Sequence, residues 1–325
     1  MIQPINIGIM GCANIAQRTM LAKFNLMPEF NLVAVASRNI DKARQVALKF
    51  DCEAIHGYNQ LIERKDITAI YMPLPTGLHE EWVMKCLTKN KHVFVEKSFG
   101  RNHKETSRMV ELASKKGLIV MENFMFLYHS QHQFVKQLIE KEEIGDIRCV
   151  RSSFGFPPLK EDNFRYDKEL GGGSLYDAGA YTIRASSMLL GDSLKVQSSF
   201  LRKNEEGIDI YGGAQLINLD GQIAQVAFGF DNFYQCNYEI WGAKGKITVN
   251  KAFTPSEEFK PIITLEKQGF RKDHVIDSDD HFRNILISFA DKIHNMKNYE
   301  LIYDEILSQS KLIDEVNQCA KMAKK

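Results

Sequence analysis

Residues 1–123 alternate between two kinds of hydrophobic pattern, and this alternation constrains the fold more than any other feature of the chain. Short, almost continuously apolar runs are typical of strands buried on both faces, and the longer amphipathic stretches between them have helical spacing. The expected strands are Ile5–Met10, Asn31–Ser37, Ala69–Met72, His92–Glu96 and Ile119–Glu122. The expected helices are Ile15–Met27, Asp41–Phe50, His79–Thr88 and Arg101–Lys116. Such repetition of strand and helix predicts a doubly wound parallel sheet.

The remainder of the chain has a different pattern, in which apolar and polar residues alternate as they do in half-buried strands. The expected strands are Lys195–Leu201, Ile210–Leu219, Gln222–Phe230, Tyr234–Trp241, Lys246–Val249 and Ile262–Glu266. The expected helices are Ser130–Glu140, Ser174–Leu190, Asp279–Asn295 and Tyr303–Met322. We therefore expect an α/β protein with two domains, residues 1–123 and residues 124–325. The second is predicted to have a large, mainly antiparallel open sheet with helices on one face.

Composition and charge exclude several classes of function. With 42 Lys and Arg against 41 Asp and Glu, the net charge of +1 favours neither nucleic acid nor an anionic membrane as a partner. Apolar runs stay far below the roughly 20 residues of a membrane span. The six cysteines are widely scattered without metal-ligand spacing, which is typical of reduced cytosolic thiols. We expect a cytoplasmic protein without a metal site.

The expected first strand runs directly into a turn of small residues, which is the first indication of a ligand. The segment Gly11-Cys12-Ala13-Asn14-Ile15-Ala16 has the form G-x-A-x-x-A, a dinucleotide fingerprint with alanine at two of its small positions. Glycine permits the tight turn, and the alanines let a pyrophosphate approach the backbone amides and the helix approach the strand. We predict that the residues from Gly11 to Ile15 bind a dinucleotide. The alternative is an ordinary tight turn between a strand and a helix.

The second expected strand ends in Ala36-Ser37-Arg38, and this end predicts the type of dinucleotide. An enzyme that binds the ribose hydroxyls of NAD usually has Asp or Glu here. A hydroxyl followed by a guanidinium suits a 2′-phosphate instead, and Lys42 can add a second positive charge. We predict that NADP(H) is preferred and that NAD(H) is the second candidate. The alternative is a solvated basic surface at the start of a helix.

Three further motifs follow in order along the chain. They are Met72-Pro73-Leu74-Pro75-Thr76-Gly77-Leu78-His79, Val95-Glu96-Lys97-Ser98 and Gly171-Gly172-Gly173-Ser174-Leu175-Tyr176-Asp177-Ala178-Gly179-Ala180-Tyr181. Over essentially its whole length the chain resembles the Gfo/Idh/MocA oxidoreductases. The resemblance implies a nicotinamide-dependent oxidoreductase with an N-terminal Rossmann domain and a C-terminal α/β domain. We expect Leu74, Pro75, His79 and Glu96 to bind the cofactor, although His79 is equally compatible with a structural role.

A narrower resemblance concerns four other segments. They are Glu122-Asn123-Phe124-Met125-Phe126-Leu127-Tyr128-His129-Ser130-Gln131-His132, Phe154-Gly155-Phe156-Pro157-Pro158, Asn163-Phe164-Arg165-Tyr166 and Trp241-Gly242-Ala243-Lys244-Gly245-Lys246. They are similar to the branch with NDP-hexose 3-ketoreductases and dihydrodiol dehydrogenases. Ser98 departs from the family's usual proline, which puts the local backbone after Lys97 in question. Tyr181 stands where many members have histidine, although the ketoreductase and dihydrodiol branches have tyrosine.

Hydride transfer to a ketone leaves an alkoxide, which needs a proton donor and a nearby positive charge. We predict that Tyr181 is the general acid and that Lys97 stabilises its phenolate and binds the substrate oxygen. Asp177 precedes Tyr181 by four residues on the same expected helix and is predicted to orient Lys97 or a substrate hydroxyl. Arg165 is predicted to contact the nicotinamide or a substrate phosphate. Alternatively, Asp177 caps the helix and Tyr181 is a core aromatic.

These residues predict an NADP(H)-dependent oxidoreductase of CH–OH groups. The narrower resemblance implies that its substrate is a keto group on a nucleotide-linked sugar. The alternatives are a dehydrogenase of free sugars or trans-dihydrodiols and a dinucleotide-binding regulator without turnover. A regulator needs no proton donor, so the combination of Lys97, Asp177 and Tyr181 disfavours it. We also predict a homodimer or homotetramer joined through the uncovered face of the second sheet. The apolar residues expected on that face are Ile210, Ala214, Leu216, Ala224, Val226 and Phe228.

Overall fold

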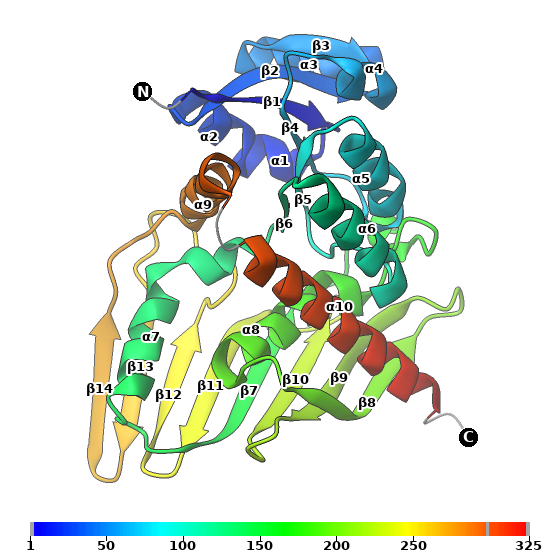
Figure 1. Ribbon diagram of the computed structural model, residues 1–325. Helices are drawn as coiled ribbons and strands as arrows, with labels where there is room; N and C mark the ends of the chain where they lie inside the picture. Colours follow the sequence, from blue (N-terminus) through cyan, green and yellow to red (C-terminus); the bar gives the residue numbers. More distant parts are fainter. Residues whose placement is uncertain (1–2, 297–298, 323–325) are drawn as a thin grey trace. The chain divides into compact units, whose positions relative to one another are not determined.

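The computed structural model describes residues 3–296 and 299–322 and divides into two compact units, each with its own sheet (Figure 1). The first unit combines Met1–Asn123 with Phe282–Leu307. The second combines Phe124–His281 with Ser308–Lys325. Each unit packs helices against a sheet, so the predicted α/β class is confirmed.

The sheet of the first unit is parallel, with the strand order β3-β2-β1-β4-β5-β6. Its strands are β1 (Ile5–Met10), β2 (Phe30–Ser37), β3 (Glu53–His56), β4 (Ala69–Met72), β5 (His92–Val95) and β6 (Val120–Glu122). Its helices within residues 1–123 are α1 (Asn14–Thr19), α2 (Leu21–Leu26), α3 (Ile40–Phe50), α4 (Tyr58–Glu63), α5 (His79–Thr88) and α6 (His103–Lys116). The order reverses between β1 and β4, and ligands of such sheets bind at the carboxyl ends of strands near this point.

Two elements of this unit differ from the predicted pattern. Strand β3 and helix α4 are additional, because β3 is a short edge strand in which only Ile55 is buried. The expected helix Ile15–Met27 is divided at Met20 into α1 and α2. Hydrogen bonds still run through Met20, whose N–H donates to the carbonyl of Ala16 at 2.9 Å. The division is therefore a local irregularity.

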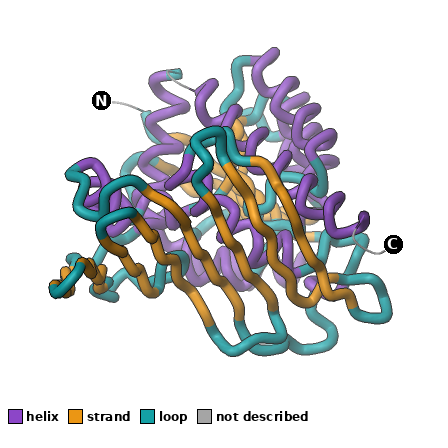
Figure 2. Tube along the Cα trace, turned by 90° about the horizontal axis from the view of Figure 1, so that it is seen from below, coloured by secondary structure: helices purple, strands orange, loops and turns teal. Residues whose placement is uncertain are grey.

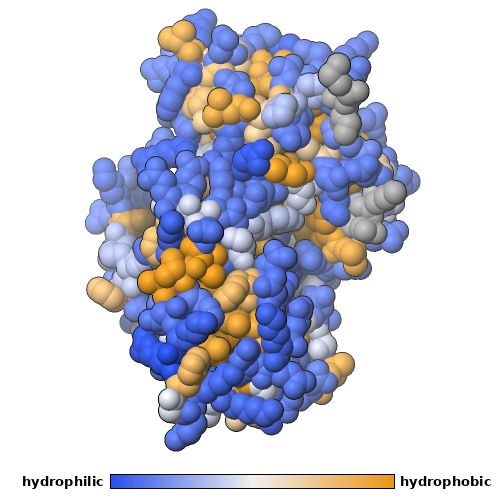
Figure 3. Space-filling model, turned by 90° about the vertical axis from the view of Figure 1, so that its left-hand side faces the viewer, coloured by the Kyte–Doolittle hydropathy of each residue, from blue (hydrophilic) through white to orange (hydrophobic). Residues whose placement is uncertain are grey.

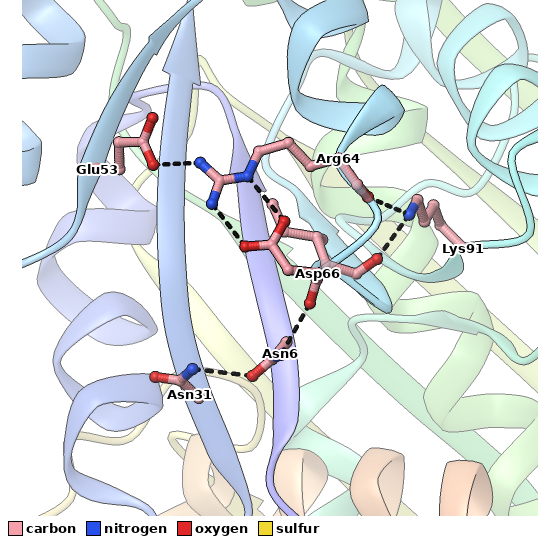
Figure 4. A network of polar contacts seen from close by, with 7 residues as sticks. Asn6, Asn31, Glu53, Arg64, Asp66 and Lys91 are labelled. Carbon is pink, nitrogen blue, oxygen red and sulfur yellow. Dashed lines mark hydrogen bonds and ion pairs between the residues drawn. The ribbon is translucent and has the colours of Figure 1, made fainter.

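A polar network joins the amino-terminal ends of the strands, at the end of the sheet opposite the expected ligand (Figure 4). Arg64 donates to the carboxylate of Asp66 through Nε at 2.9 Å and Nη2 at 2.6 Å. The buried ammonium of Lys91 donates to the backbone carbonyls of Arg64 and Ile67, each at 2.6 Å. Asn6 at the start of β1 donates to the carbonyl of Asp66 at 2.8 Å. These bonds fix the loop before β4 to its neighbours.

The structure departs from the predicted division of the chain at Phe282–Leu307, which belongs to the first unit rather than the second. Phe289 of α9 (His281–Asn295) packs on Phe94 of β5, with ring centroids 5.2 Å apart. The hydroxyl of Tyr303, in α10 (Tyr299–Met322), donates to the carbonyl of Leu118. Amphipathic helices late in the chain thus return to the parallel sheet, and sequence order does not reveal such a return.

The sheet of the second unit has eight strands in the order β14-β13-β12-β11-β7-β10-β9-β8. Its strands are β7 (Ile147–Gly155), β8 (Lys195–Lys203), β9 (Asp209–Ile217), β10 (Ile223–Gly229), β11 (Gln235–Gly242), β12 (Gly245–Asn250), β13 (Ile262–Lys267) and β14 (Phe270–Val275). All neighbours pair antiparallel except β7 and β10, which confirms the predicted mainly antiparallel sheet. Helices α7 (Ser130–Glu140) and α8 (Ala180–Leu190) pack on one face. Figure 2 shows the other face uncovered.

The predicted composition of the uncovered face is wrong. Leu216, Ala224, Val226 and Phe228 are buried on the helix-covered face, and Ile210 and Ala214 are half-buried. Side chains along a strand alternate between faces, so the apolar set of such a strand faces the core. The uncovered face instead carries polar side chains and the half-exposed ring of Trp241. Its central residues are Arg151, Gln225, Glu239 and Lys246.

Exposed apolar side chains on this unit are scattered rather than gathered into one large patch. At the edge formed by β13 and β14, Ile262, Phe270 and Val275 are exposed. On the face that Figure 3 draws, several separate hydrophobic groups lie among hydrophilic residues. Among the helices that the structure describes, none is both long enough and apolar enough to span a bilayer.

Candidate active site

The turn after β1 has the geometry of a dinucleotide cradle. Gly11 has a φ of 120°, and a Cβ placed there would lie 3.0 Å from the side chain of Leu74. The backbone conformation therefore favours glycine, and Leu74 would have to shift to admit a side chain. Ala13 precedes the first residue of α1 and cannot cap it, because it has no polar side chain. Asn14 and Ile15 are exposed, whereas Ala16 is buried against the sheet.

Cys12 lies within this turn and is a neutral thiol. Burial raises the pKa of its thiol above the ordinary value, although the hydroxyl of Ser37 partly opposes the shift. Only a thiolate is a good nucleophile, so this environment disfavours reactivity of the Cys12 thiol. Its backbone carbonyl accepts a hydrogen bond from the Gln17 amide at 3.1 Å. Cys12 therefore contributes the backbone of the turn.

The end of β2 holds Ser37 and Arg38 in a fixed backbone. The carbonyl of Ser37 accepts a hydrogen bond from the N–H of Gly57 at 2.8 Å, and Nε2 of His56 lies 3.1 Å from the carbonyl of Arg38. Both contacts come from the neighbouring strand β3 and the turn after it. The side chains of Arg38 and Lys42 are exposed, so two cations are accessible at this strand end.

His79 lies buried between two loops, which favours the structural alternative over cofactor binding. Its ring is 0% exposed. Its Nδ1 lies 2.9 Å from the carbonyl of Ser98 and its Nε2 lies 2.8 Å from the carbonyl of Leu74. Burial lowers the pKa of this imidazole. His79 therefore joins the loop after β4 to the loop after β5, while Pro75 in the former is half-buried.

Glu96 and Lys97 follow β5, and the Glu96 carboxylate is turned toward the neighbouring strands. Its Oε1 accepts hydrogen bonds from the Tyr71 hydroxyl at 2.6 Å and the Asn123 amide at 2.7 Å. Burial raises the pKa of this carboxyl, while the two hydrogen bonds oppose the shift. The half-buried Lys97 comes next, and its peptide bond to Ser98 is cis. Glu96 is thus a fixed support beside Lys97.

In the second unit, the glycine turn brings together two predicted residues. The N–H of Gly173 donates to the carbonyl of Arg165 at 3.0 Å, which lays residues 164–166 against the turn. Nε of Arg165 donates to Oδ2 of Asp177 at 2.6 Å. This ion pair is mostly shielded from solvent, with the Asp177 side chain 12% exposed. Asp177 is therefore paired with Arg165 rather than serving only as a helix cap.

The helix that carries Asp177 and Tyr181 is less regular than the sequence predicts. Residues Leu175–Gly179 form a π-helical turn, and α8 begins only at Ala180. Short π-helical turns are rare in proteins, and those that do occur are often found at functional sites. Residues four apart still lie close together on such a turn.

Tyr181 is surrounded by aromatic rings. Its side chain is 7% exposed, and the ring centroids of Phe124, Phe126, Phe154 and Phe253 lie 5.6, 5.8, 5.1 and 5.7 Å away. Its hydroxyl lies 3.8 Å from the sulfur of Met125. These contacts fix the position of the ring, which is buried as the alternative of a core aromatic expects.

Sequence reasoning missed three polar residues that support this site. Tyr71 and Asn123 hold Glu96, and Asp209 accepts hydrogen bonds from Ser174 and Leu175. The available signal was a polar residue at a position where a buried strand begins or ends. Within the described ranges 3–296 and 299–322, no group of three or more His, Cys, Asp or Glu could hold a metal ion.

Comparison with known proteins gives matches over both units. The profile described as "Oxidoreductase family, NAD-binding Rossmann fold" matches residues 5–124, and the "GFO/IDH/MocA C-terminal domain" matches residues 132–248. A dTDP-3,4-didehydro-2,6-dideoxy-alpha-D-glucose 3-reductase of Saccharopolyspora spinosa is 40% identical over 289 residues, 89% of this chain and 87% of that protein. The enzyme of the same name from Actinomadura kijaniata is 35% identical over 98% of this chain and 96% of its own length.

Solved structures agree with these relatives. KijD10, a 3-ketoreductase from Actinomadura kijaniata in complex with NADP and TDP-benzene, superimposes with a TM-score of 0.95 at 35% identity, over 97% of each chain. Structures of KijD10 with a tyrosine replaced by phenylalanine, or a lysine by alanine, are also known. With both units matched and the relatives aligned almost end to end, the chain belongs to the Gfo/Idh/MocA family of oxidoreductases.

Proposed function

We propose that this protein is an NADPH-dependent reductase of a keto group on a nucleotide-linked deoxysugar. The observation that carries the proposal is the similarity, over nearly the whole chain, to dTDP-sugar 3-reductases and to a 3-ketoreductase bound to NADP. A free-sugar or dihydrodiol dehydrogenase is the less favoured substrate class.

The coenzyme fits the residues of the first unit. Gly11 has a φ of 120°, and without a side chain at this position the backbone of the turn would be open to a diphosphate. Ser37, Arg38 and Lys42 would hold the 2′-phosphate, because hydroxyl and cationic donors suit a dianion. When bound, NADPH supplies the hydride for the keto carbon.

Lys97 and Tyr181 are proposed to complete the reduction. Tyr181 Oη would give its proton to the developing alkoxide oxygen, and the Lys97 ammonium would stabilise both the alkoxide and the phenolate. The lysine and tyrosine replaced in the KijD10 variants are separated by the same number of residues as Lys97 and Tyr181. The Arg165–Asp177 pair would hold a substrate hydroxyl or phosphate.

The substrate proposal is tested by comparing steady-state turnover of NADPH with a dTDP-linked 3-keto-deoxysugar and with NADP+ plus free xylose, glucose or a dihydrodiol. We expect kcat/KM for the nucleotide-linked sugar to exceed every other value by at least about 100-fold, because binding of remote groups accelerates the reaction. Comparable rates on a free sugar would favour the other substrate class.

We also propose a homodimer or homotetramer joined through the uncovered face of the second sheet. Nη1 of Arg151 lies 3.2 Å from Oε1 of Glu239, and the guanidinium carbon of Arg151 lies 5.5 Å from the centroid of the Trp241 ring. Lys246 bridges Glu239 at 3.1 Å and Glu266 at 3.2 Å. A row with both charge signs and a half-exposed tryptophan is self-complementary, as a twofold interface requires.

The compartment is proposed to be the cytoplasm. All six cysteines are free thiols, and Cys86, Cys149 and Cys236 among them are buried. Free thiols of this kind persist where the surroundings are reducing.

A further inference from the structure

We infer that Asp209 is a positioning residue that fixes the glycine turn, and through it the Arg165–Asp177 pair and the helix of Tyr181. The inference rests on the proposed function for its kinetic consequences, and it concerns a residue outside every sequence motif discussed above. Asp209 is the first residue of β9, and its side chain points to the start of the helical segment rather than to solvent.

The first contact holds the beginning of that helical segment. Oδ2 of Asp209 accepts a hydrogen bond from the Ser174 hydroxyl at 2.8 Å and another from the Leu175 N–H at 2.7 Å. Asp209 is 9% exposed and Ser174 is 0% exposed. Asp177 lies two residues after Leu175, so these bonds set the position of the turn on which its carboxylate stands.

The second contact concerns the glycine turn itself. A Cβ at Gly173 would lie 2.3 Å from Oδ1 of Asp209, and Gly173 has a φ of 123°. The carboxylate therefore packs directly on the turn, where any side chain would displace it. The same glycine donates its N–H to the carbonyl of Arg165 at 3.0 Å, so the anchored turn also places Arg165.

Together, these contacts connect strand β9 to the glycine turn and, through the turn, to Arg165. Strand β9 is paired with β8 and β10, which makes Asp209 a rigid support, whereas three consecutive glycines are flexible by themselves. A buried carboxylate is costly unless hydrogen-bonded, and donors to a charged acceptor form strong bonds. Burial raises the pKa of Asp209, and the bonds from Leu175 and Ser174 oppose that shift. Loss of the carboxylate would free the turn.

The consequence is a separation between chemistry and coenzyme binding. The residues proposed to hold the diphosphate and the 2′-phosphate of NADPH belong to the first unit, whereas Asp209, Arg165 and Tyr181 belong to the second. In Asp209→Ala we expect kcat to fall by about 10–100-fold, since small displacements of catalytic groups are costly. The dissociation constant of NADPH, measured by fluorescence titration without substrate, should change less than about twofold.

Two further variants separate positioning from general stability. Ser174→Ala removes one bond to Asp209, whereas Ser186→Ala removes an equally buried hydroxyl that bonds to the Thr182 carbonyl at 2.9 Å within α8. We expect a loss of kcat in Ser174→Ala and none in Ser186→Ala at equal melting temperature. Asp209→Asn keeps an acceptor oxygen and should retain more of the wild-type kcat than Asp209→Ala.

Hydrogen exchange of the segment 165–180 provides a test that needs no turnover. We expect faster exchange in Asp209→Ala and Ser174→Ala than in Ser186→Ala. Unchanged exchange and unchanged kcat in folded Asp209→Ala, or an equal loss of kcat in Ser186→Ala, would overturn the inference. A wild-type protein that binds NADPH but reduces no keto sugar would contradict the proposed function, and the exchange data would still decide the role of Asp209.

Discussion

Removing the Arg38 guanidinium should convert a protein that prefers NADPH into one that binds both coenzymes weakly and similarly. Arg38 stands at the end of β2 with its backbone carbonyl held by His56 and its side chain exposed. The variant Arg38→Ala leaves that backbone contact intact, because His56 bonds to the carbonyl. The change therefore removes the guanidinium, together with its interaction with Tyr58, and keeps the backbone of the strand end.

The magnitude follows from the kind of contact. A hydrogen bond between charged groups contributes about 1.5–3 kcal/mol, and each tenfold in affinity corresponds to about 1.4 kcal/mol. The exposed position of Arg38 allows screening by solvent and salt, which favours the lower part of this range. We expect the dissociation constant of NADPH to rise by about 10–30-fold, and that of NADH to change by less than about twofold.

The assay is equilibrium titration of the substrate-free protein with each coenzyme at two salt concentrations. The matched control is Arg44→Ala, which removes an exposed arginine from helix α3, the helix that follows Arg38, where it pairs with Asp41 at 3.2 Å. The control should leave both affinities unchanged although the net charge changes equally. If Arg38→Ala weakened NADH as much as NADPH, or if the wild type preferred NADH, our interpretation of this strand end would be wrong.

Three other predictions concern chemistry, assembly and acid stability. Tyr181→Phe should lower kcat by about 10²–10⁴-fold with little change in NADPH affinity, and Lys97→Ala should lower kcat at least as much. Near-normal stopped-flow rates in both variants would exclude the proposed proton transfer. Arg151→Glu should dissociate the oligomer into monomers, because it places a negative charge beside Glu239 and beside the equivalent glutamate of the other copy. Light scattering would measure the mass, and an unchanged mass would place the interface elsewhere. His92 accepts a hydrogen bond from the Ile119 N–H through Nδ1, and burial lowers its pKa to about 4. Because the unfolded chain protonates near pH 6.5, stability should fall as the pH drops from about 6.5 to about 4, by about 2 kcal/mol at pH 5. His92→Asn should lose less stability over this range in urea unfolding, and equal losses in both proteins would contradict the assignment.

Much of the fold could be predicted from the sequence because strands buried on both faces are unmistakable. The expected run Ile5–Met10 coincides with β1, and Ala69–Met72 coincides with β4. Some strands leave a weaker trace: the edge strand β14 has four polar side chains among its six residues, and the central strand β7 is interrupted by Arg148 and Arg151. Neither strand could be recognised without its neighbours.

The faces of the second sheet illustrate a different limit. Alternation shows that one face of a strand is apolar, but it does not show which face the helices cover. We assigned Val226 and Phe228 to the uncovered face, and the structure buries them against the helix-covered side. The exposed row around Arg151 and Trp241 could not be assembled from the sequence, because its members lie on strands far apart along the chain.

Some predicted site residues follow from local sequence patterns, whereas the role of others depends on contacts made only in the folded protein. Positions at strand ends, such as Gly11, Arg38 and Lys97, were predictable because the carboxyl edge of a parallel sheet is where ligands bind. The position of His79 was not, because its role depends on two carbonyl groups, at Leu74 and Ser98, that only the folded loops bring to it. A histidine in a motif therefore indicates importance without indicating what it contacts.

Buried carboxylates hold loop conformations that the sequence motifs do not specify. Loops at strand ends lie outside the hydrogen-bond ladder of the sheet, so their backbones need other acceptors to hold one conformation. Glu122 accepts the N–H of Phe99 at 2.8 Å in the loop after Lys97, and Asp209 accepts the N–H of Leu175 before Asp177. The two acceptors stand 23 and 34 residues from their donors, on strands that other strands already fix. Because Asp209 begins a strand and Glu122 ends one, each carboxylate ties its loop to a rigid sheet. Such long-range acceptors are the part of an active site that local sequence patterns cannot predict.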